Sequence, residues 1–366
     1  MQRIYGSSRY LLTVSFLAYG AYANVALFTG GQATLDGKTD IMHGAVTAQI
    51  DKLYKNELPH RDVAIGLVGA ARYLLIGEGR EGVLAGADGW LFTKEEARLI
   101  GTDLDVTMRH VADVRARLAE QGTQLVILPV PAKSDVYADH AARPEMSAEM
   151  ATLYDDFQSA LANAGIASVD ARAALNTERK TAPAFFATDT HWTQGGASAV
   201  ADLLAQSGVI EAGAEDFAAV DAERNRFTGD LVSFVTSDGW APMVGLAQEV
   251  ARPYRAMPVA ASSSALTAAD IFAAPQTGGI VLIGTSYSAD PRWSFAEALK
   301  LALGRDVLNY AQEGQGPARP MLAYLASADF ADAPPDWVIW EIPVRYLPDQ
   351  TIWETEPDTA GTAHGT

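Results

Sequence analysis

The sequence predicts an α/β fold with a mainly parallel, doubly wound sheet, because short apolar runs that suit buried strands alternate with stretches at helical spacing. The clearest strand candidates are 125–128, 280–283 and 337–342, which are rich in valine, isoleucine, leucine and tryptophan. Such runs are typical of strands that are covered on both faces. Stretches with apolar residues at helical spacing, such as 106–121 and 293–303, lie next to these strand candidates in the sequence. The chain is therefore predicted to return across the sheet after each strand.

Residues 1–29 form the first predicted element, in which Arg3 and Arg9 precede an uncharged stretch from 10 to 28. This arrangement predicts an export signal, since positive residues stay on the cytoplasmic side. Small residues at 21–23 fit the cleavage site of a removable signal peptide, whereas the apolar continuation to 28 gives nearly the length of a membrane anchor. We favour an uncleaved anchor. Either alternative places the rest of the chain outside the cytoplasm, in the periplasm and, with the anchor, at the inner membrane.

The remaining chain divides into four predicted parts. Residues 30–81 have helix-like spacing and form a helical lead-in, and 82–347 form the α/β domain. Within that domain, about 209–274 break the alternation and are interpreted as an insertion or lid. The polar, Gly- and Thr-rich segment 348–366 is predicted to be a disordered tail. In chain order, we expect a hairpin at 82–92, a helix at 106–121, a strand at 125–128, a helix at 150–164, a strand at 166–170, a helix at 193–206, a strand at 280–283, a helix at 293–303, a strand at 307–310, a helix at 321–326 and a strand at 337–342.

Composition excludes several kinds of site. The chain of 366 residues contains no cysteine, so disulfides, thiolate nucleophiles and cysteine-ligated metals are impossible. Its formal net charge of -18 argues against nucleic acid and anionic lipid as partners, because binding to phosphate depends on lysine and arginine contacts. The sequence also lacks a Gly-rich phosphate-binding loop, so no cofactor is predicted.

Ser286 is the candidate nucleophile. It stands in Gly-Thr-Ser-Tyr-Ser at 284–288, directly after the strand candidate 280–283. Reactive groups of open α/β sheets gather at the carboxyl ends of strands, and Gly284 allows a sharp turn there. Glycine and serine also end strands for structural reasons alone, so the position by itself leaves both interpretations open. No Gly-x-Ser-x-Gly elbow surrounds Ser286.

His191 is the candidate base, since a serine hydroxyl needs one and the base needs an orienting partner. Asp189 stands two residues before His191, and Thr193 is a possible N-cap of the following helix. His110 lies on the polar face of a helix candidate and His364 in the tail, which makes them poorer candidates. Capping and turn formation are the alternative explanation for the Asp-x-His pair. The pair could also bind zinc, but no third ligand is indicated, so no metal site is predicted.

These motifs together resemble the alginate O-acetyltransferase family of AlgJ and AlgX. The resemblance rests on 189–193, 284–288 and 291–293 in that order, and it covers most of the chain, with closer similarity to AlgJ at the two ends. Further matching stretches are 77–83, 89–92, 128–133, 309–314 and 340–347. The resemblance implies an SGNH-hydrolase-like fold with permuted motif order, in which the Asp-His pair precedes the serine.

On this resemblance, Ser286 is the nucleophile, His191 the general base and Asp189 its orienting carboxylate. The family implies transfer of acetyl groups to hydroxyls of an exported polysaccharide through an acetyl-serine. It also implies a multi-spanning membrane partner of the AlgI type that supplies the acetyl group. We expect the Ser286 N–H to stabilise the oxyanion. Further candidates for oxyanion or substrate contacts are Gly314, Gly316, Tyr287, Arg292, Trp293 and Arg345.

Two other functions remain open from the sequence. A secreted carbohydrate acetylesterase would use the same three residues, with water in place of the sugar hydroxyl. A polysaccharide-binding scaffold would keep the fold without turnover, and the intact Ser286, His191 and Asp189 set counts against it. Core packing and ordinary ion pairing are alternative roles for the aromatic and arginine candidates.

Overall fold

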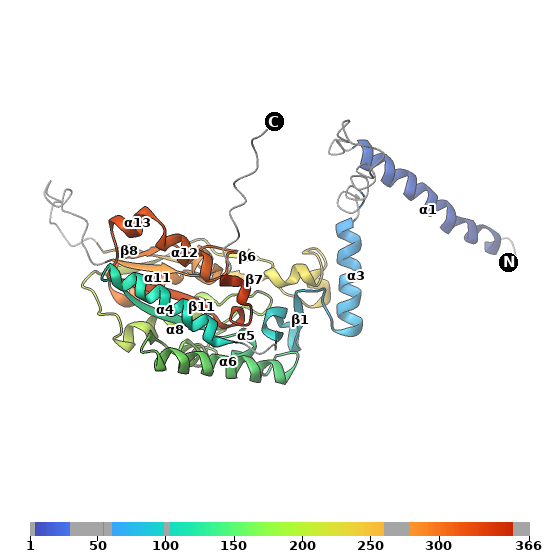
Figure 1. The fold of residues 1–366 in the computed structure, drawn as a ribbon. Coiled ribbons are helices and arrows are strands. Elements are labelled where there is room, and N and C mark those ends of the chain that lie inside the picture. Colours follow the sequence, from blue (N-terminus) through green and yellow to red (C-terminus); the bar gives the residue numbers. More distant parts are fainter. Residues whose placement is uncertain (1–3, 30–53, 55–60, 99–102, 260–278, 354–366) are drawn as a thin grey trace, which may run out of the picture.

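The computed structural model describes residues 4–29, 54, 61–98, 103–259 and 279–353 (Figure 1). Residues 354–366 of the predicted tail (348–366) and most of the predicted lead-in (30–81) lie outside these residues, whereas 350–353 form a short helix whose Trp353 is buried. An α/β domain forms the body of the molecule, and helix α1 (Ile4–Thr29) lies apart from it (Figure 1).

A five-stranded, wholly parallel sheet forms the centre of the domain. Trp337 in the middle strand lies opposite Gln124 on one side and Ile280 on the other, so three strands start in register. The doubly wound parallel sheet that the sequence predicts is confirmed. Across the sheet the order is β10 (Val307–Asn309), β9 (Ile280–Ile283), β11 (Trp337–Pro343), β3 (Gln124–Val130) and β4 (Ala167–Ser168).

Alternate residues of the strands point into two separate cores, because successive side chains of a strand face opposite sides. In β3, Val126 and Leu128 belong to one core, and Leu125 and Ile127 to the other. The first core is covered by α7 (Ala171–Glu178), α8 (Gln194–Ser207) and α11 (Phe295–Leu303). The second is covered by α4 (Leu104–Glu120), α6 (Pro144–Asn163), α12 (Ala318–Leu325) and α13 (Ala328–Asp332). Burial on both faces explains why these strands are almost continuously apolar.

The carboxyl ends of β3, β9 and β11 meet at one edge of the sheet because the strands are parallel. Lys133 follows β3 at the start of α5 (Lys133–Val136), and Ser286 follows β9 at the start of α10 (Ser286–Ala289). Arg345 follows β11 in η7 (Val344–Tyr346). Polar side chains from three neighbouring strands are thereby placed beside the crevice where ligands of open α/β sheets bind.

The hairpin predicted at 82–92 is confirmed: β1 (Val83–Ala85) pairs antiparallel with β2 (Leu91–Thr93). The turn between them, η2 (Ala87–Gly89), places Asp88 at φ 54°. Helix α3 (Arg61–Ile76) precedes the hairpin, and Ala70 of α3 shares a third, smaller core with it. The short helices η3 (Lys94–Ala97), η6 (Pro291–Trp293) and η8 (Gln350–Trp353) complete the elements outside the segment 209–259.

The segment interpreted as an insertion is more regular than its sequence suggests over its described part, 209–259. Antiparallel pairs form between β5 (Phe217–Asp221) and β8 (Tyr254–Pro258), and between β6 (Asn225–Phe227) and β7 (Glu249–Ala251). Two short helices, η4 (Asp230–Phe234) and η5 (Ala241–Val244), lie between β6 and β7. Residues 260–278 are not described.

Among the helices that the structure describes, α1 included, none is both long enough and apolar enough to cross a membrane. Polar residues such as Ser15, Tyr19 and Asn24 interrupt the apolar stretch of α1. The predicted membrane anchor is therefore not supported by the structure.

Candidate active site

Ser286 is presented by a tight turn between β9 and α10. As the first residue of α10, it contributes one of the amide groups that have no partner inside the helix. Thr285 caps the helix through its side chain, which accepts a hydrogen bond from the backbone N–H of Tyr287 at 3.4 Å. The hydroxyl Oγ of Ser286 lies 2.7 Å from Nε2 of His191. The turn thus places the Ser286 hydroxyl, at the start of α10, within hydrogen-bond distance of His191.

Glu341, on the neighbouring strand β11, holds this turn in place through hydrogen bonds. Its side chain is fully buried, and it accepts hydrogen bonds from the Thr285 N–H at 2.7 Å and the Thr285 hydroxyl at 3.0 Å. The Ser288 hydroxyl donates a further bond at 3.0 Å. Burial raises the pKa of Glu341, and these hydrogen bonds oppose the rise. A Cβ at Gly284 would lie 2.3 Å from Oε2 of Glu341, so the close approach requires glycine.

His191 and Asp189 lie in the irregular segment between α7 and α8, where Phe185 and Trp192 form an isolated bridge. Oδ1 of Asp189 lies 2.7 Å from Nδ1 of His191 and accepts the His191 backbone N–H at 2.9 Å. A carboxylate only accepts hydrogen bonds, so Nδ1 carries the proton and the lone pair of Nε2 faces Ser286. The three residues predicted from the sequence therefore lie in one hydrogen-bonded chain.

Asp230, from η4 in the segment 209–259, adds a second carboxylate beside the pair. Its backbone N–H donates to Oδ2 of Asp189 at 3.0 Å, and its Oδ1 accepts the Thr190 N–H at 2.8 Å. Burial favours a higher pKa for Asp189, but the hydrogen bonds from His191 and from two backbone N–H groups outweigh it and lower the pKa. Loss of solvation and the nearby Asp189 charge raise the pKa of Asp230. Asp189 therefore keeps its negative charge beside His191.

Asp189, His191 and Asp230 also present one ligand atom each within 4.8 Å of one another, a spacing that fits a metal ion. The sequence indicated only the first two of these ligands. Asp189 and His191 already satisfy each other through their hydrogen bond, which is the arrangement that a base needs.

Lys133 holds the segment that carries Asp189 and His191. Its ammonium group is buried and donates to three backbone carbonyls: Leu91 at 2.7 Å, Ala187 at 2.9 Å and Asp189 at 2.9 Å. The rings of Trp90 and Phe92 lie 5.1 and 5.3 Å from Nζ. Burial lowers the pKa of Lys133 to about 8. One cation thereby ties the β1–β2 hairpin to the segment that carries Asp189 and His191.

The relation of this chain to known proteins is consistent across sequence and structure. The family model described as "SGNH hydrolase-like domain, acetyltransferase AlgX" matches residues 83–344. The chain belongs to this family. The "Probable alginate O-acetylase AlgJ" of Pseudomonas aeruginosa is 36% identical over 324 residues, which cover 85% of this chain and 82% of that protein. The resemblance inferred from the motifs is thereby confirmed.

Two solved structures of the AlgX-type family are also similar. The O-acetyltransferase domain of Pseudomonas putida AlgJ superposes with a TM-score of 0.63 at 31% identity, covering 77% of this chain and 96% of that one. Pseudomonas aeruginosa AlgX gives a TM-score of 0.59 at 25% identity, covering 74% of this chain and 65% of that one. The SGNH hydrolase-like fold is therefore shared with both.

A cavity of about 660 Å³ opens beside Ser286 and His191 in this AlgX-type domain. Gly314, at φ 69°, lines it, and so does Arg345. The guanidinium of Arg345 is engaged with protein, through Glu95 at 3.0 Å and the Tyr287 hydroxyl at 2.7 Å. Gly316 has φ 63° but is not among the residues that line this cavity.

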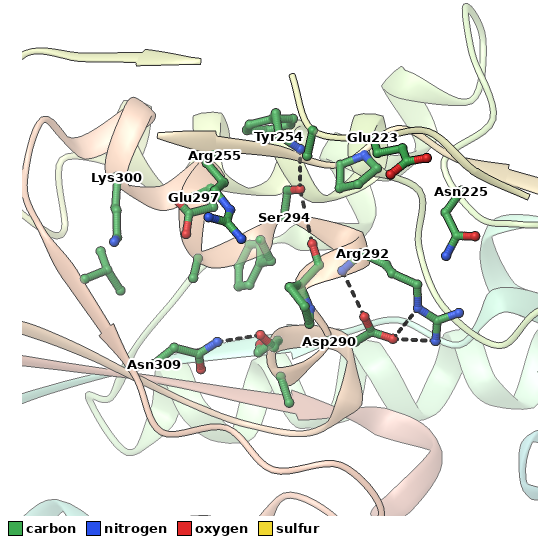
Figure 2. A pocket seen from close by; sticks show the side chains of 18 of the residues that line it. Glu223, Asn225, Tyr254, Arg255, Asp290, Arg292, Ser294, Glu297, Lys300 and Asn309 are labelled. Carbon is green, nitrogen blue, oxygen red and sulfur yellow. Dashed lines mark hydrogen bonds and ion pairs between the residues drawn. The ribbon is translucent and has the colours of Figure 1, made fainter. Parts of the chain in front are cut away.

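Three expected substrate contacts lie elsewhere. Tyr287 and Trp293 are fully buried, and neither is among the residues that line the cavity beside Ser286. The Tyr287 hydroxyl donates to the Thr190 carbonyl at 2.9 Å, and the Trp293 ring stacks on His191 with centroids 5.1 Å apart. Figure 2 shows that Arg292 lines a different cavity, of about 670 Å³, where its Nε donates to Asp290 at 2.7 Å. The sequence left both substrate contact and core packing or ion pairing open for these side chains, because exposure cannot be read from residue type.

Four residues of the site were not identified from the sequence: Lys133, Asp230, Glu341 and Arg143, which lines the cavity beside Ser286. A signal existed for Glu341, because a charge inside an otherwise apolar strand must be paired when it is buried. Lys133 directly follows a buried strand, which is a weaker signal of the same kind. Asp230 and Arg143 stand in segments without a recognisable pattern.

Proposed function

We propose that this chain transfers acetyl groups to hydroxyls of an exported polysaccharide through an acetyl ester on Ser286. The observation that carries the proposal is the hydrogen-bonded chain from Ser286 through His191 to Asp189 in a member of an acetyltransferase family. The names of the AlgJ relatives make alginate the first polymer to test.

In the first half of the reaction, Nε2 of His191 accepts the proton of Ser286 while Oγ forms a bond to the acetyl carbonyl carbon. The backbone N–H of Ser286 donates to the oxyanion, which is a large source of transition-state stabilisation in acyl transfer. The tetrahedral intermediate then expels the donor's leaving group, which takes the proton from His191. Ser286 is left as the acetyl ester.

In the second half, a sugar hydroxyl gives its proton to His191 and attacks the acetyl carbon. Collapse of the second tetrahedral intermediate releases Ser286 Oγ, which recovers the proton from His191. Asp189 stabilises the imidazolium that forms in both halves, because its ionised carboxylate lies 2.7 Å from Nδ1 of His191. Ser286 and His191 are thus restored at the end of the cycle, and the net change is transfer of the acetyl group from donor to sugar.

Mass spectrometry of the full chain after exposure to an activated acetyl ester tests the proposal. We expect one acetyl adduct on Ser286, absent from Ser286→Ala and retained in the matched variant Ser288→Ala. Turnover in Ser286→Ala should fall by about 10³-fold or more. An adduct that persists in Ser286→Ala would contradict the assignment. Release of free acetate in the presence of acceptor oligosaccharides, without acetylated sugar, would indicate the acetylesterase instead.

We further propose a periplasmic location, supported by Arg3 and Arg9 before the uncharged stretch, and a multi-spanning membrane protein of the AlgI type as the source of acetyl groups. Fusing a reporter enzyme that is active only outside the cytoplasm to the C-terminus tests the location. Loss of polymer acetylation on deletion of the membrane protein, with this chain still present, tests the partner.

A further inference from the structure

A second cavity lies next to the turn that carries Ser286, and the proposed function does not use it. Its volume of about 670 Å³ falls within the roughly 300–1,000 Å³ of ordinary ligand pockets. Of the described residues, none lines both this cavity and the one beside Ser286. Helix α10 contributes to both linings, since Ser286 at its start lines the first cavity, and Ser288 and Ala289 line the second. We call the second cavity the accessory cavity (Figure 2).

Apolar side chains form much of the lining of the accessory cavity. Pro253 directly precedes β8, Ala296 belongs to α11, and Leu308 lies in β10 at the edge of the central sheet. Leu308 leaves 54% of its surface exposed, although it is a large apolar residue. Covering such surface removes it from water and is favourable, so a ligand with an apolar body gains from contact here.

Four of the seven charged side chains that line the accessory cavity are engaged with protein groups. Asp290 accepts a hydrogen bond from Nε of Arg292 at 2.7 Å, and Lys300 forms an ion pair at 3.1 Å with a carboxylate outside the cavity. Glu297 accepts a backbone N–H at 2.8 Å. The other three, whose side chains have no hydrogen bond or ion pair with any described residue, are Glu223, Arg224 and Arg255.

Arg255 is the lining cation that is free to hold a ligand. Glu223 and Arg224 are adjacent in the chain and opposite in charge, so their fields largely offset each other, whereas the chain neighbours of Arg255 are uncharged. The backbone of Arg255 is fixed, because it lies opposite Val220 in the pairing of β8 with β5. Figure 2 shows its side chain pointing from β8 into the cavity. A guanidinium on a rigid strand is thus available to an anion.

We propose that the accessory cavity is a second ligand site, which binds a small organic anion with an apolar body and holds the anionic group on Arg255. The planar guanidinium gives two parallel hydrogen bonds to a carboxylate or a phosphate. The apolar lining covers the body of the ligand. A chain of net charge -18 repels anions at long range, so retention of one requires an unpaired cation inside a cavity.

Isothermal titration of the full chain with octanoate tests the proposal, because octanoate joins a carboxylate to an apolar chain. We expect acetate, which lacks the apolar body, and 1-octanol, which lacks the charge, each to bind about tenfold more weakly or less tightly still. Arg255→Gln should weaken octanoate binding by about tenfold, and Leu308→Ser by about threefold. Arg252→Gln removes an exposed arginine that does not line the cavity, and it should leave the affinity unchanged. Octyl phosphate in the same titration shows whether a phosphate or a carboxylate is the preferred anionic group.

Equal affinity of the unsubstituted chain and Arg255→Gln for octanoate would overturn the inference, and so would failure of both octanoate and octyl phosphate to bind. The rate of acetyl-adduct formation on Ser286 locates the site. Octanoate in the accessory cavity should leave the KM for the activated acetyl ester unchanged, whereas a competitive rise in KM would place octanoate beside Ser286 and contradict the inference. The titration does not depend on turnover, so a chain without acetyl transfer would count against the proposed function alone.

Discussion

The segment that carries His191 and the turn that carries Ser286 are both held by a buried ionisable side chain, but the two side chains have opposite charge. Lys133 donates to three carbonyls around the first segment, whereas Glu341 accepts from three donors around the second. The difference follows from the local backbone. An irregular segment presents unpaired carbonyls, which need a donor, while the start of a helix presents unpaired N–H groups, which need an acceptor.

The two halves of the hydrogen-bonded chain from Ser286 to Asp189 are each positioned from the end of a different strand. Lys133 follows β3 and Glu341 lies near the end of β11, so the sheet edge itself sets the distance between Nε2 of His191 and Oγ of Ser286. Neither charge touches the reacting atoms. Lys133 acts through backbone carbonyls, including that of Asp189, and Glu341 acts through Thr285 and Ser288 on either side of Ser286.

The largest effect is expected from Glu341→Ala. The substitution leaves the N–H and hydroxyl of Thr285 without an acceptor and opens a cavity, so we expect unfolding to require about 3 kcal/mol less free energy. Acetylation of Ser286 should slow by about 100-fold, since a displaced nucleophile is costly. Urea unfolding and the rate of acetyl-adduct formation measure the two effects. Glu341→Gln keeps one acceptor oxygen, so its unfolding free energy should fall by less than half as much. If Glu341→Ala were as stable as the unsubstituted chain, Glu341 would not support the turn.

The fold and the three central residues could be predicted because their signals are local. The apolar strands, the glycine before Ser286 and the two-residue spacing of Asp189 and His191 are all visible in short stretches. Whether an aromatic ring or an arginine faces a ligand depends instead on what packs against it from distant segments. The sequence left the roles of Trp293 and Arg292 open for this reason, and Asp230 was missed because the insertion that delivers it has no periodic pattern.

The next effect is a pH dependence of the unfolding free energy, which has opposite signs for the buried charges of Lys133 and Glu341. Burial lowers the pKa of Lys133 from 10.5 to about 8, so the unfolded chain binds the extra proton more tightly. The cost of burying the charge is therefore constant below about pH 8 and is relieved as the pH rises to about 10.5. We expect the unfolding free energy of the unsubstituted chain, relative to Lys133→Met, to rise by about 3 kcal/mol across that window.

Glu341 should behave in the opposite sense, because burial raises its pKa and the cost of its charge is relieved as the pH falls. Urea unfolding curves at matched pH values measure the difference in unfolding free energy between the unsubstituted chain and Lys133→Met from pH 8 to 10.5. A difference that stays constant from pH 8 to 10.5 would mean that Lys133 is not held in a buried, charged state.

The smallest effect is expected from Ser288→Ala, and it also tests which serine reacts. Ser288 donates one of the three hydrogen bonds to Glu341, so its loss should cost about 1 kcal/mol of unfolding free energy while both bonds from Thr285 remain. The rate of acetyl-adduct formation should stay within about threefold, because Ser286 and His191 keep their contact. If Ser288→Ala instead abolished the adduct as Ser286→Ala is expected to, the nucleophile would be Ser288. The buried position of its hydroxyl against Glu341, away from His191, is the physical reason to expect otherwise.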